Sequence, residues 1–117
     1  RQAQAAGERQ RSLRLSGDFH LAIAAGSGHA TLGRVLRELI SRTSLVLMAY
    51  GPNDTGQPGD AAACGCREHE GLIDAIRLRD APEAMRRMLS HLERIESTLA
   101  FDVKPRSGVD IAALLGS

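Results

Sequence analysis

The sequence is poor in aromatic residues. They make up 3% of its 117 residues, with no tryptophan, and the rings present are Phe19, Tyr50 and Phe101. Strands favour aromatic and β-branched residues, whereas straight-chain residues such as leucine, methionine and arginine lose little rotamer freedom in a helix. Leucine, alanine, isoleucine and arginine abound here, so the composition predicts one all-α domain.

Other scarcities exclude several classes of protein. The chain has two cysteines, Cys64 and Cys66, which cannot build the disulfide framework of a small secreted protein. Its longest apolar run, Leu45 to Tyr50, is far shorter than the ~20 residues of a membrane span, and the first residues are too charged for a signal peptide. A formal net charge of +1 provides no basic surface for nucleic acid. We therefore expect a cytoplasmic protein that neither enters a membrane nor binds DNA by itself.

Breaker and capping residues predict where the helices begin and end. Gly7 is expected to interrupt a first helix, and Thr31 to cap a later one. The segment from Gly51 to Cys66 is rich in glycine and proline and is expected to be a long loop. Asp80, followed by Pro82 and Glu83, has the pattern of a helix start with a capping box. The predicted helices cover residues 8–25, 31–50, from 67 onward, and 82–101, the last with Ala84, Met88, Leu92, Ile95 and Leu99 inward.

Three of the four histidines lie on the inward faces of different predicted helices. His69 has apolar residues three and four positions on, His91 is flanked by Met88 and Ile95, and His20 shares a face with Ala24. A lone histidine of this kind is usually a satisfied core residue. Burying three imidazoles in a small core, however, costs several kcal/mol unless something satisfies them. A divalent metal would do so, and three histidine ligands would leave room for water or a carboxylate.

Arg42 and Thr43 interrupt the most apolar helix. The Arg42 guanidinium either reaches the rim of the helix or lines a cavity, where it would grip a carboxylate in bidentate fashion. His29 is expected in a turn or at a helix end without a ligand role, and Cys64 and Cys66 give only a weak signal for metal or redox chemistry. The carboxylates are expected mainly on solvated faces, where they form no acid/base pair; they are Asp18, Glu68, Glu70 and Asp74.

Several short motifs together resemble one known family. They are Leu15-Ser16-Gly17-Asp18-Phe19-His20, Ala24 to Gly28, Ser41-Arg42-Thr43-Ser44-Leu45, Glu68-His69, Leu72 to Ile76, and Met88 to Leu92. In this combination they resemble the C-terminal ligand-binding (FCD) domain of FadR-type GntR transcription regulators. The resemblance covers most of the chain.

The resemblance implies an antiparallel helical bundle around a central cavity, with a divalent metal held by an aspartate and three histidines. His20, His69 and His91 match the histidine ligands, whereas Ser16 stands where the family has its aspartate. Asp18 cannot replace it, because two residues along a helix turn a side chain by about 200°. Ser16, Arg42 and Thr43 are the expected contacts of a small organic acid.

The function expected from the sequence is therefore effector sensing, not catalysis. We expect residues 1–101 to form the effector-binding domain, either complete or without its first helix, and residues 102–117 to form a tail. The metal would be Zn²⁺ or Ni²⁺, and the protein a homodimer that reaches DNA only through a winged helix-turn-helix domain absent from this chain. Two alternatives stay open at this point: a structural dimerisation module without metal, and a metalloenzyme.

Overall fold

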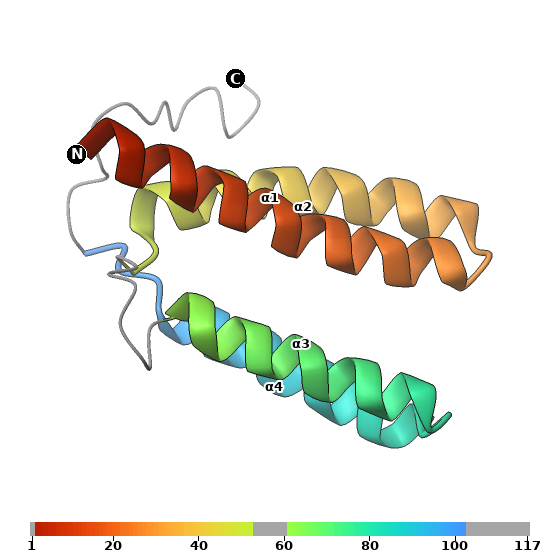
Figure 1. Ribbon diagram of the computed structural model, residues 1–117. Helices are drawn as coiled ribbons and strands as arrows, with labels where there is room; N and C mark the ends of the chain where they lie inside the picture. The colour runs from red at the N-terminus through yellow and green to blue at the C-terminus, as the bar shows by residue number, and fades with distance from the viewer. Residues whose placement is uncertain (1, 53–60, 103–117) are drawn as a thin grey trace. The chain divides into compact units, whose positions relative to one another are not determined.

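The computed structural model describes residues 2–52 and 61–102, with side chains described for residues 7–52 and 65–102. Its elements are α1 (Gln2–Gly26), α2 (Ala30–Tyr50), α3 (Ala61–Arg77) and α4 (Ala81–Ser97). All regular structure in the described ranges is helical, which confirms the all-α prediction. The chain divides into two compact units: α1 and α2 belong to the first, and α3 and α4 to the second. Each unit is an antiparallel pair of helices (Figure 1).

A tight turn at Ser27–His29 joins the two helices of the first unit. Gly28 adopts a positive φ of 73°, which glycine allows at little cost. The N-cap of α2 is His29, whose Nδ1 accepts a hydrogen bond from the backbone N–H of Leu32 at 3.1 Å. The prediction of a Thr31 cap was wrong by two residues, because this histidine supplies the acceptor that a cap needs. His29 therefore has the helix-end position expected of it.

The prediction that Gly7 interrupts a helix was also wrong. Helix α1 runs without a break from Gln2 to Gly26, because an exposed glycine only lowers helix stability by about 1 kcal/mol and the rest of the helix outweighs that cost. Gly17 has a different part in the same helix. It is buried, and a Cβ built on it would lie 2.7 Å from Cγ2 of Ile40 in α2. The two helices therefore approach closely at a position where only glycine fits.

The far end of α2 is fixed by contacts from other parts of the first unit. Nη2 of Arg9 donates to the carbonyl oxygen of Leu47 at 2.6 Å, and the N–H of Gly51 donates to the same oxygen at 2.9 Å. These bonds satisfy a carbonyl that the helix leaves unpaired at its end. The ring of Tyr50 lies 4.9 Å from that of Phe101, centroid to centroid. Helix α2 thus ends at the Gly51-Pro52 signal that the sequence predicted.

Helix α3 begins earlier than expected. It starts at Ala61 and includes Gly65 and Cys66, which were predicted to be part of the loop. The glycines and prolines of residues 51–66 led to a loop prediction that included Ala61 to Ala63. These three residues favour a helix, because alanine has the highest helix propensity of all residues. Residues 53–60 lie outside the described ranges. The loop prediction was therefore wrong for its last six residues.

Helix α4 begins as predicted and ends earlier. Oδ1 of Asp80 accepts from the N–H of Glu83 at 3.1 Å, and a proline lies in the first turn, which confirms the capping signal. The helix ends at Ser97 instead of Phe101, because Oγ1 of Thr98 donates to the carbonyl oxygen of Ile95 at 2.6 Å and closes the last turn. Leu92, expected inward, is 51% exposed, while its neighbour His91 is buried.

The described core is small and consists of short side chains and one leucine. Its buried apolar residues are Ala24, Ala49, Leu72 and Ala75. No helix in the described ranges is long and apolar enough to span a membrane. Of the expected C-terminal tail, only its first residue, Asp102, is described. The central cavity expected from the sequence stays a prediction.

Candidate metal centre

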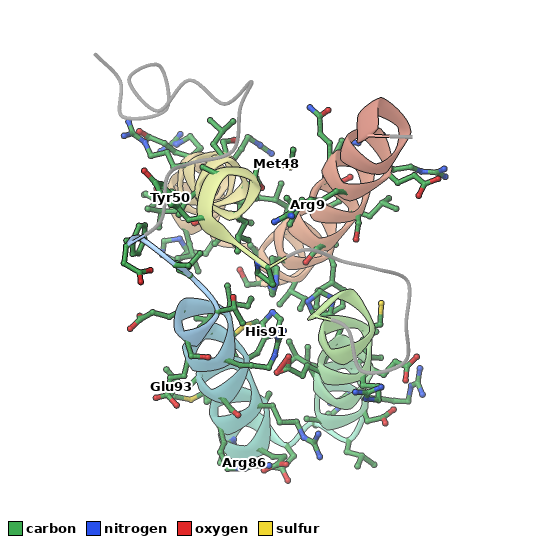
Figure 2. The ribbon with its side chains drawn as sticks, turned by 90° about the vertical axis from the view of Figure 1, so that its left-hand side faces the viewer. Arg9, Met48, Tyr50, Arg86, His91 and Glu93 are labelled. Carbon is green, nitrogen blue, oxygen red and sulfur yellow. The ribbon has the colours of Figure 1, made fainter. Side chains whose placement is uncertain are left out.

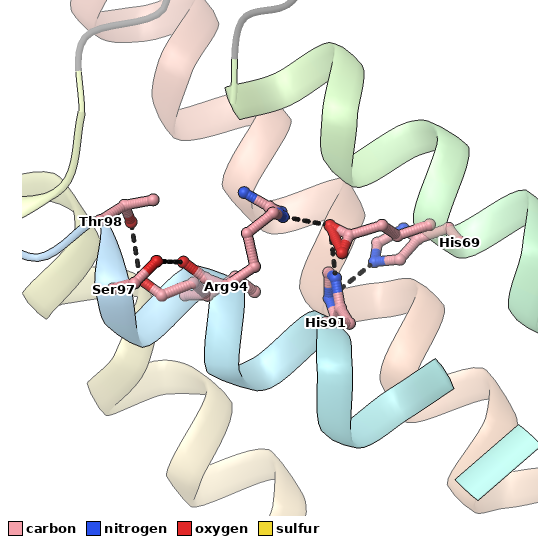
Figure 3. A network of polar contacts seen from close by, with 7 residues as sticks. His69, His91, Arg94, Ser97 and Thr98 are labelled. Atoms are coloured by element: carbon pink, nitrogen blue, oxygen red, sulfur yellow. Dashed lines mark hydrogen bonds and ion pairs between the residues drawn. The ribbon is translucent and has the colours of Figure 1, made fainter. Parts of the chain in front are cut away.

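Two of the three predicted histidine ligands face each other within the second unit. His69 comes from α3 and His91 from α4, and their Nε2 atoms lie 3.3 Å apart (Figure 3). The rings meet edge to face, with centroids 4.8 Å apart. In Figure 2, His91 points from α4 toward α3, whereas Glu93 on the same helix points away. The inward placement of His69 and His91 thus brings together two nitrogens that can each hold a metal ion.

The other side of the His91 ring contacts a carboxylate. Nδ1 of His91 lies 3.2 Å from Oε1 of Glu68, and Nε of Arg94 donates to the same oxygen. The His91 side chain is 4% exposed, and those of Glu68 and Arg94 are also mostly covered. In the tautomer with its proton on Nδ1, His91 donates to this carboxylate oxygen. Its Nε2 then carries a lone pair directed at His69.

The surroundings of His69 keep its imidazole neutral. Burial lowers the pKa of His69 below its usual 6.5, the nearby His91 lowers it further, and the Glu68 carboxylate opposes these effects. Only a neutral imidazole has a lone pair for a metal ion. At pH 7 the His69 side chain is therefore in the form that binds a cation.

The distance between the facing nitrogens can be compared with metal coordination. Two imidazole nitrogens bound to one Zn²⁺ at about 2.0–2.1 Å lie about 3.3–3.4 Å apart at the tetrahedral angle, and about 2.9 Å apart at a right angle. The observed 3.3 Å lies within the range that two histidine nitrogens on one ion span. The donor set also fits, because a histidine ligand commonly donates its second ring N–H to a carboxylate, as His91 does to Glu68.

His20, the third predicted ligand, belongs to the first unit. It lies on α1, is partly buried, and packs edge to face against Phe19 with ring centroids 5.3 Å apart. Its role as a ligand together with His69 and His91 stays a prediction.

The family model of the FCD domain matches residues 1–94. The chain belongs to the FCD family. The resemblance noted in the sequence is thereby confirmed, and with it the kind of protein: FCD domains are the regulatory, effector-binding domains of GntR-type regulators. Membership of this family implies a regulatory domain that takes a small-molecule effector. No curated protein and no solved structure matches the chain.

The predicted effector contacts of this FCD domain lie on the first unit. Nη2 of Arg42 is 3.1 Å from Oε1 of Glu38, one turn earlier on α2, and the Arg42 side chain is 51% exposed. Thr43 is exposed, and Ser16 is partly buried on α1. The placement of Arg42 agrees with a guanidinium at the rim of its helix. The role of all three residues in ligand binding stays a prediction.

An open groove lies between α1 and α2, with a volume of about 590 Å³. Its lining residues include Gly17, Ile40 and three arginines, which are Arg11, Arg14 and Arg37. None of the predicted metal or effector residues lines it. This groove is not predictable from the periodicity of either helix, because it forms only where the two helices pair.

Glu68 and Arg94 are the site residues that sequence reasoning missed. Glu68 was assigned to a solvated face, and this was wrong: it is partly buried, because His91 and Arg94 both bind its carboxylate. The available signals were its position directly before His69, and the position of Arg94 one turn after His91.

The remaining polar candidates do not join the site. The carboxylates Asp18, Glu70 and Asp74 are exposed, as expected. Cys66 is an exposed free thiol, and the side chain of Cys64 lies outside the described ones. His29 is occupied as the cap of α2.

Proposed function

We propose that this FCD domain senses a small organic acid through a bound divalent metal ion. The ligands would be His69 and His91 of the second unit and His20 of the first. The observation that supports this most directly is the pair of Nε2 atoms 3.3 Å apart, one of them on a buried ring oriented by a carboxylate. When bound, the metal would act as a Lewis acid that attracts a carboxylate oxygen.

Zn²⁺ or Ni²⁺ is the proposed ion, because imidazole nitrogens are good ligands for both. Three neutral histidine ligands would leave room at the ion for a further ligand. A carboxylate from the effector would be that ligand, and the effector's other polar groups would contact Ser16, Arg42 and Thr43.

Ser16 has a consequence for this proposal. With a serine in place of the family's aspartate, the three histidine ligands bring no negative charge to the ion. An anionic effector would then supply the charge that the protein does not. We therefore expect the metal-loaded domain to prefer small carboxylates to neutral molecules of the same size.

The proposed regulatory output follows from the proposed set of ligands. A metal held by histidines of both units, with the acid bound to it, would favour one arrangement of the helices over others. A ligand shifts such an equilibrium only by its differential affinity for the two states. In a homodimeric regulator this shift would change how winged helix-turn-helix domains engage an operator.

Zinc binding tests the proposal. Zn²⁺ is titrated into the full chain in competition with a chromophoric chelator, and we expect one ion per chain for the natural sequence. His69→Ala and His91→Ala should lose this binding. His29→Asn is the matched control, because it removes a histidine and keeps a residue that caps helices well. Equal zinc content in His69→Ala and the natural sequence would overturn the proposal.

Effector binding has its own measurement. Short mono- and dicarboxylates are screened by thermal unfolding with and without bound zinc. A specific ligand raises the apparent stability by mass action, so the melting temperature should rise with acid concentration only in the zinc-loaded protein. An equal rise in the zinc-free protein would show that the acid does not bind through the metal.

A further inference from the structure

Glu68 lies where it can control the metal-binding nitrogen of His91 without being a ligand itself. Its Oε1 contacts Nδ1 of His91, which is on the opposite edge of the ring from Nε2. An ion bound at Nε2, between the two histidines, would therefore be held by His91 and not by this carboxylate oxygen. Glu68 acts on the site through the ring.

We propose that Glu68 is the positioning residue of this centre, fixing the His91 ring and its proton so that the Nε2 lone pair faces His69. This inference rests on the proposed metal function. Its geometric basis is the set of contacts on both sides of a ring that is almost completely buried. Outer carboxylates of this kind orient a histidine ligand and raise its basicity.

Arg94 keeps the carboxylate in place. It donates from Nε to the same Glu68 oxygen that His91 contacts, and it lies one turn after His91 on α4. The pair bridges α3 and α4, so the orientation of His91 depends on a contact between two helices and not on one rotamer alone. A charge-assisted hydrogen bond is stronger than a neutral one, which suits Arg94 to this task.

The facing nitrogens make the position of the His91 proton decisive. If it lay on Nε2, it would occupy the space between the two rings and block the lone pair. With the proton on Nδ1, both Nε2 atoms can direct lone pairs at one ion. Glu68 favours the arrangement with the proton on Nδ1, because an ionised carboxylate accepts hydrogen bonds and donates none.

The test compares three variants of the full chain. Glu68→Gln keeps the shape and one acceptor but removes the charge, and Glu68→Ala removes both. Glu70→Gln is the matched control, since Glu70 is an exposed glutamate two residues away on the same helix. In the zinc competition titration we expect Glu68→Gln to weaken affinity about 10-fold and Glu68→Ala up to about 100-fold, with Glu70→Gln unchanged. Far-UV circular dichroism checks that each variant is helical.

A second readout does not depend on metal. Long-range ¹H–¹⁵N correlation spectra of the zinc-free protein at pH 8 report which nitrogen of His91 carries its proton. We expect Nδ1 in the natural sequence and in Glu70→Gln, with a shift toward Nε2 in Glu68→Ala.

The outcomes separate the two proposals. Zinc affinity in both Glu68 variants within twofold of the Glu70→Gln value would overturn the positioning role while leaving the metal site standing. An Nε2 proton on His91 in the natural sequence would also overturn it. If the natural sequence binds no zinc, the proposed function fails, and the spectra still decide whether Glu68 fixes the His91 proton.

Discussion

The close approach of α1 and α2 at Gly17 predicts that alanine is destabilising at this position but not at Gly7 of the same helix. A methyl group added by Gly17→Ala would lie 2.7 Å from Cγ2 of Ile40, which is shorter than real contacts of this kind. Isoleucine is branched at Cβ and strongly prefers one χ1 rotamer in a helix, so this methyl cannot turn away cheaply. The helices would have to move apart.

The expected change in the free energy of unfolding is the difference between a stabilising and a destabilising effect. Replacing glycine by alanine inside a helix stabilises it by up to about 1 kcal/mol, and overpacking a close contact costs about 1–3 kcal/mol. We expect Gly17→Ala to lower the free energy of unfolding by about 1 kcal/mol. Gly7→Ala, in the same helix with no atom within 4 Å of the added methyl, should raise it by about 0.5–1 kcal/mol.

Urea unfolding, monitored by circular dichroism, measures the free energy of unfolding of both variants. A double-mutant cycle with Ile40→Ala isolates the contact, because Gly17→Ala should become stabilising once Cγ2 is gone. If Gly17→Ala stabilises the natural sequence as much as Gly7→Ala does, the close approach of the two helices is not as described.

Three further predictions concern caps and charges. Asp80→Ala should cost about 0.5–2 kcal/mol in urea unfolding, because it removes the N-cap of α4. Arg9→Met should cost about 1.5 kcal/mol in the same assay, because it removes a charged donor from the end of α2. Hydrogen bonds from Arg86 and then Arg87 lower the pKa of the Glu83 carboxyl to about 2. Its contribution to stability is thus present above pH 4.5 and lost as the pH falls through 2, and an NMR titration of the Glu83 carboxyl measures this directly.

Matched controls accompany these predictions. Asp74→Ala removes an exposed carboxylate whose ion pair with Arg77 is itself exposed, and it should change stability by less than about 1 kcal/mol. Arg11→Met removes an exposed arginine two residues from Arg9 and should have as small an effect. Glu83→Gln should abolish the acid-range loss of stability assigned to that carboxyl. Equal costs for Arg9→Met and Arg11→Met would contradict the role given to the Arg9 hydrogen bond.

Local signals were sufficient for part of the fold. The start of α4 could be predicted because a cap, a proline and a glutamate at fixed spacing act within one turn. The end of α2 likewise follows from Gly51 and Pro52. The start of α3 was missed because glycine and proline nearby outweighed three alanines in the interpretation, although propensity is a sum over the whole segment.

The candidate site was predictable only in part, and for a physical reason. Apolar spacing places His69 and His91 on the inward faces of their helices, but it does not specify which helices pair. The same periodicity assigns Glu68 to solvent. The side chain turns inward because its two partners come from another helix, and a pattern within one helix has no information about them.

The connection between α3 and α4 has a kinetic consequence. Glu68, His69, His91 and Arg94 all lie on one hairpin whose turn is only Leu78 to Asp80. Contacts between residues so near in sequence require little loop closure, and structures rich in them form rapidly. We therefore expect the two imidazoles to meet as soon as this hairpin folds.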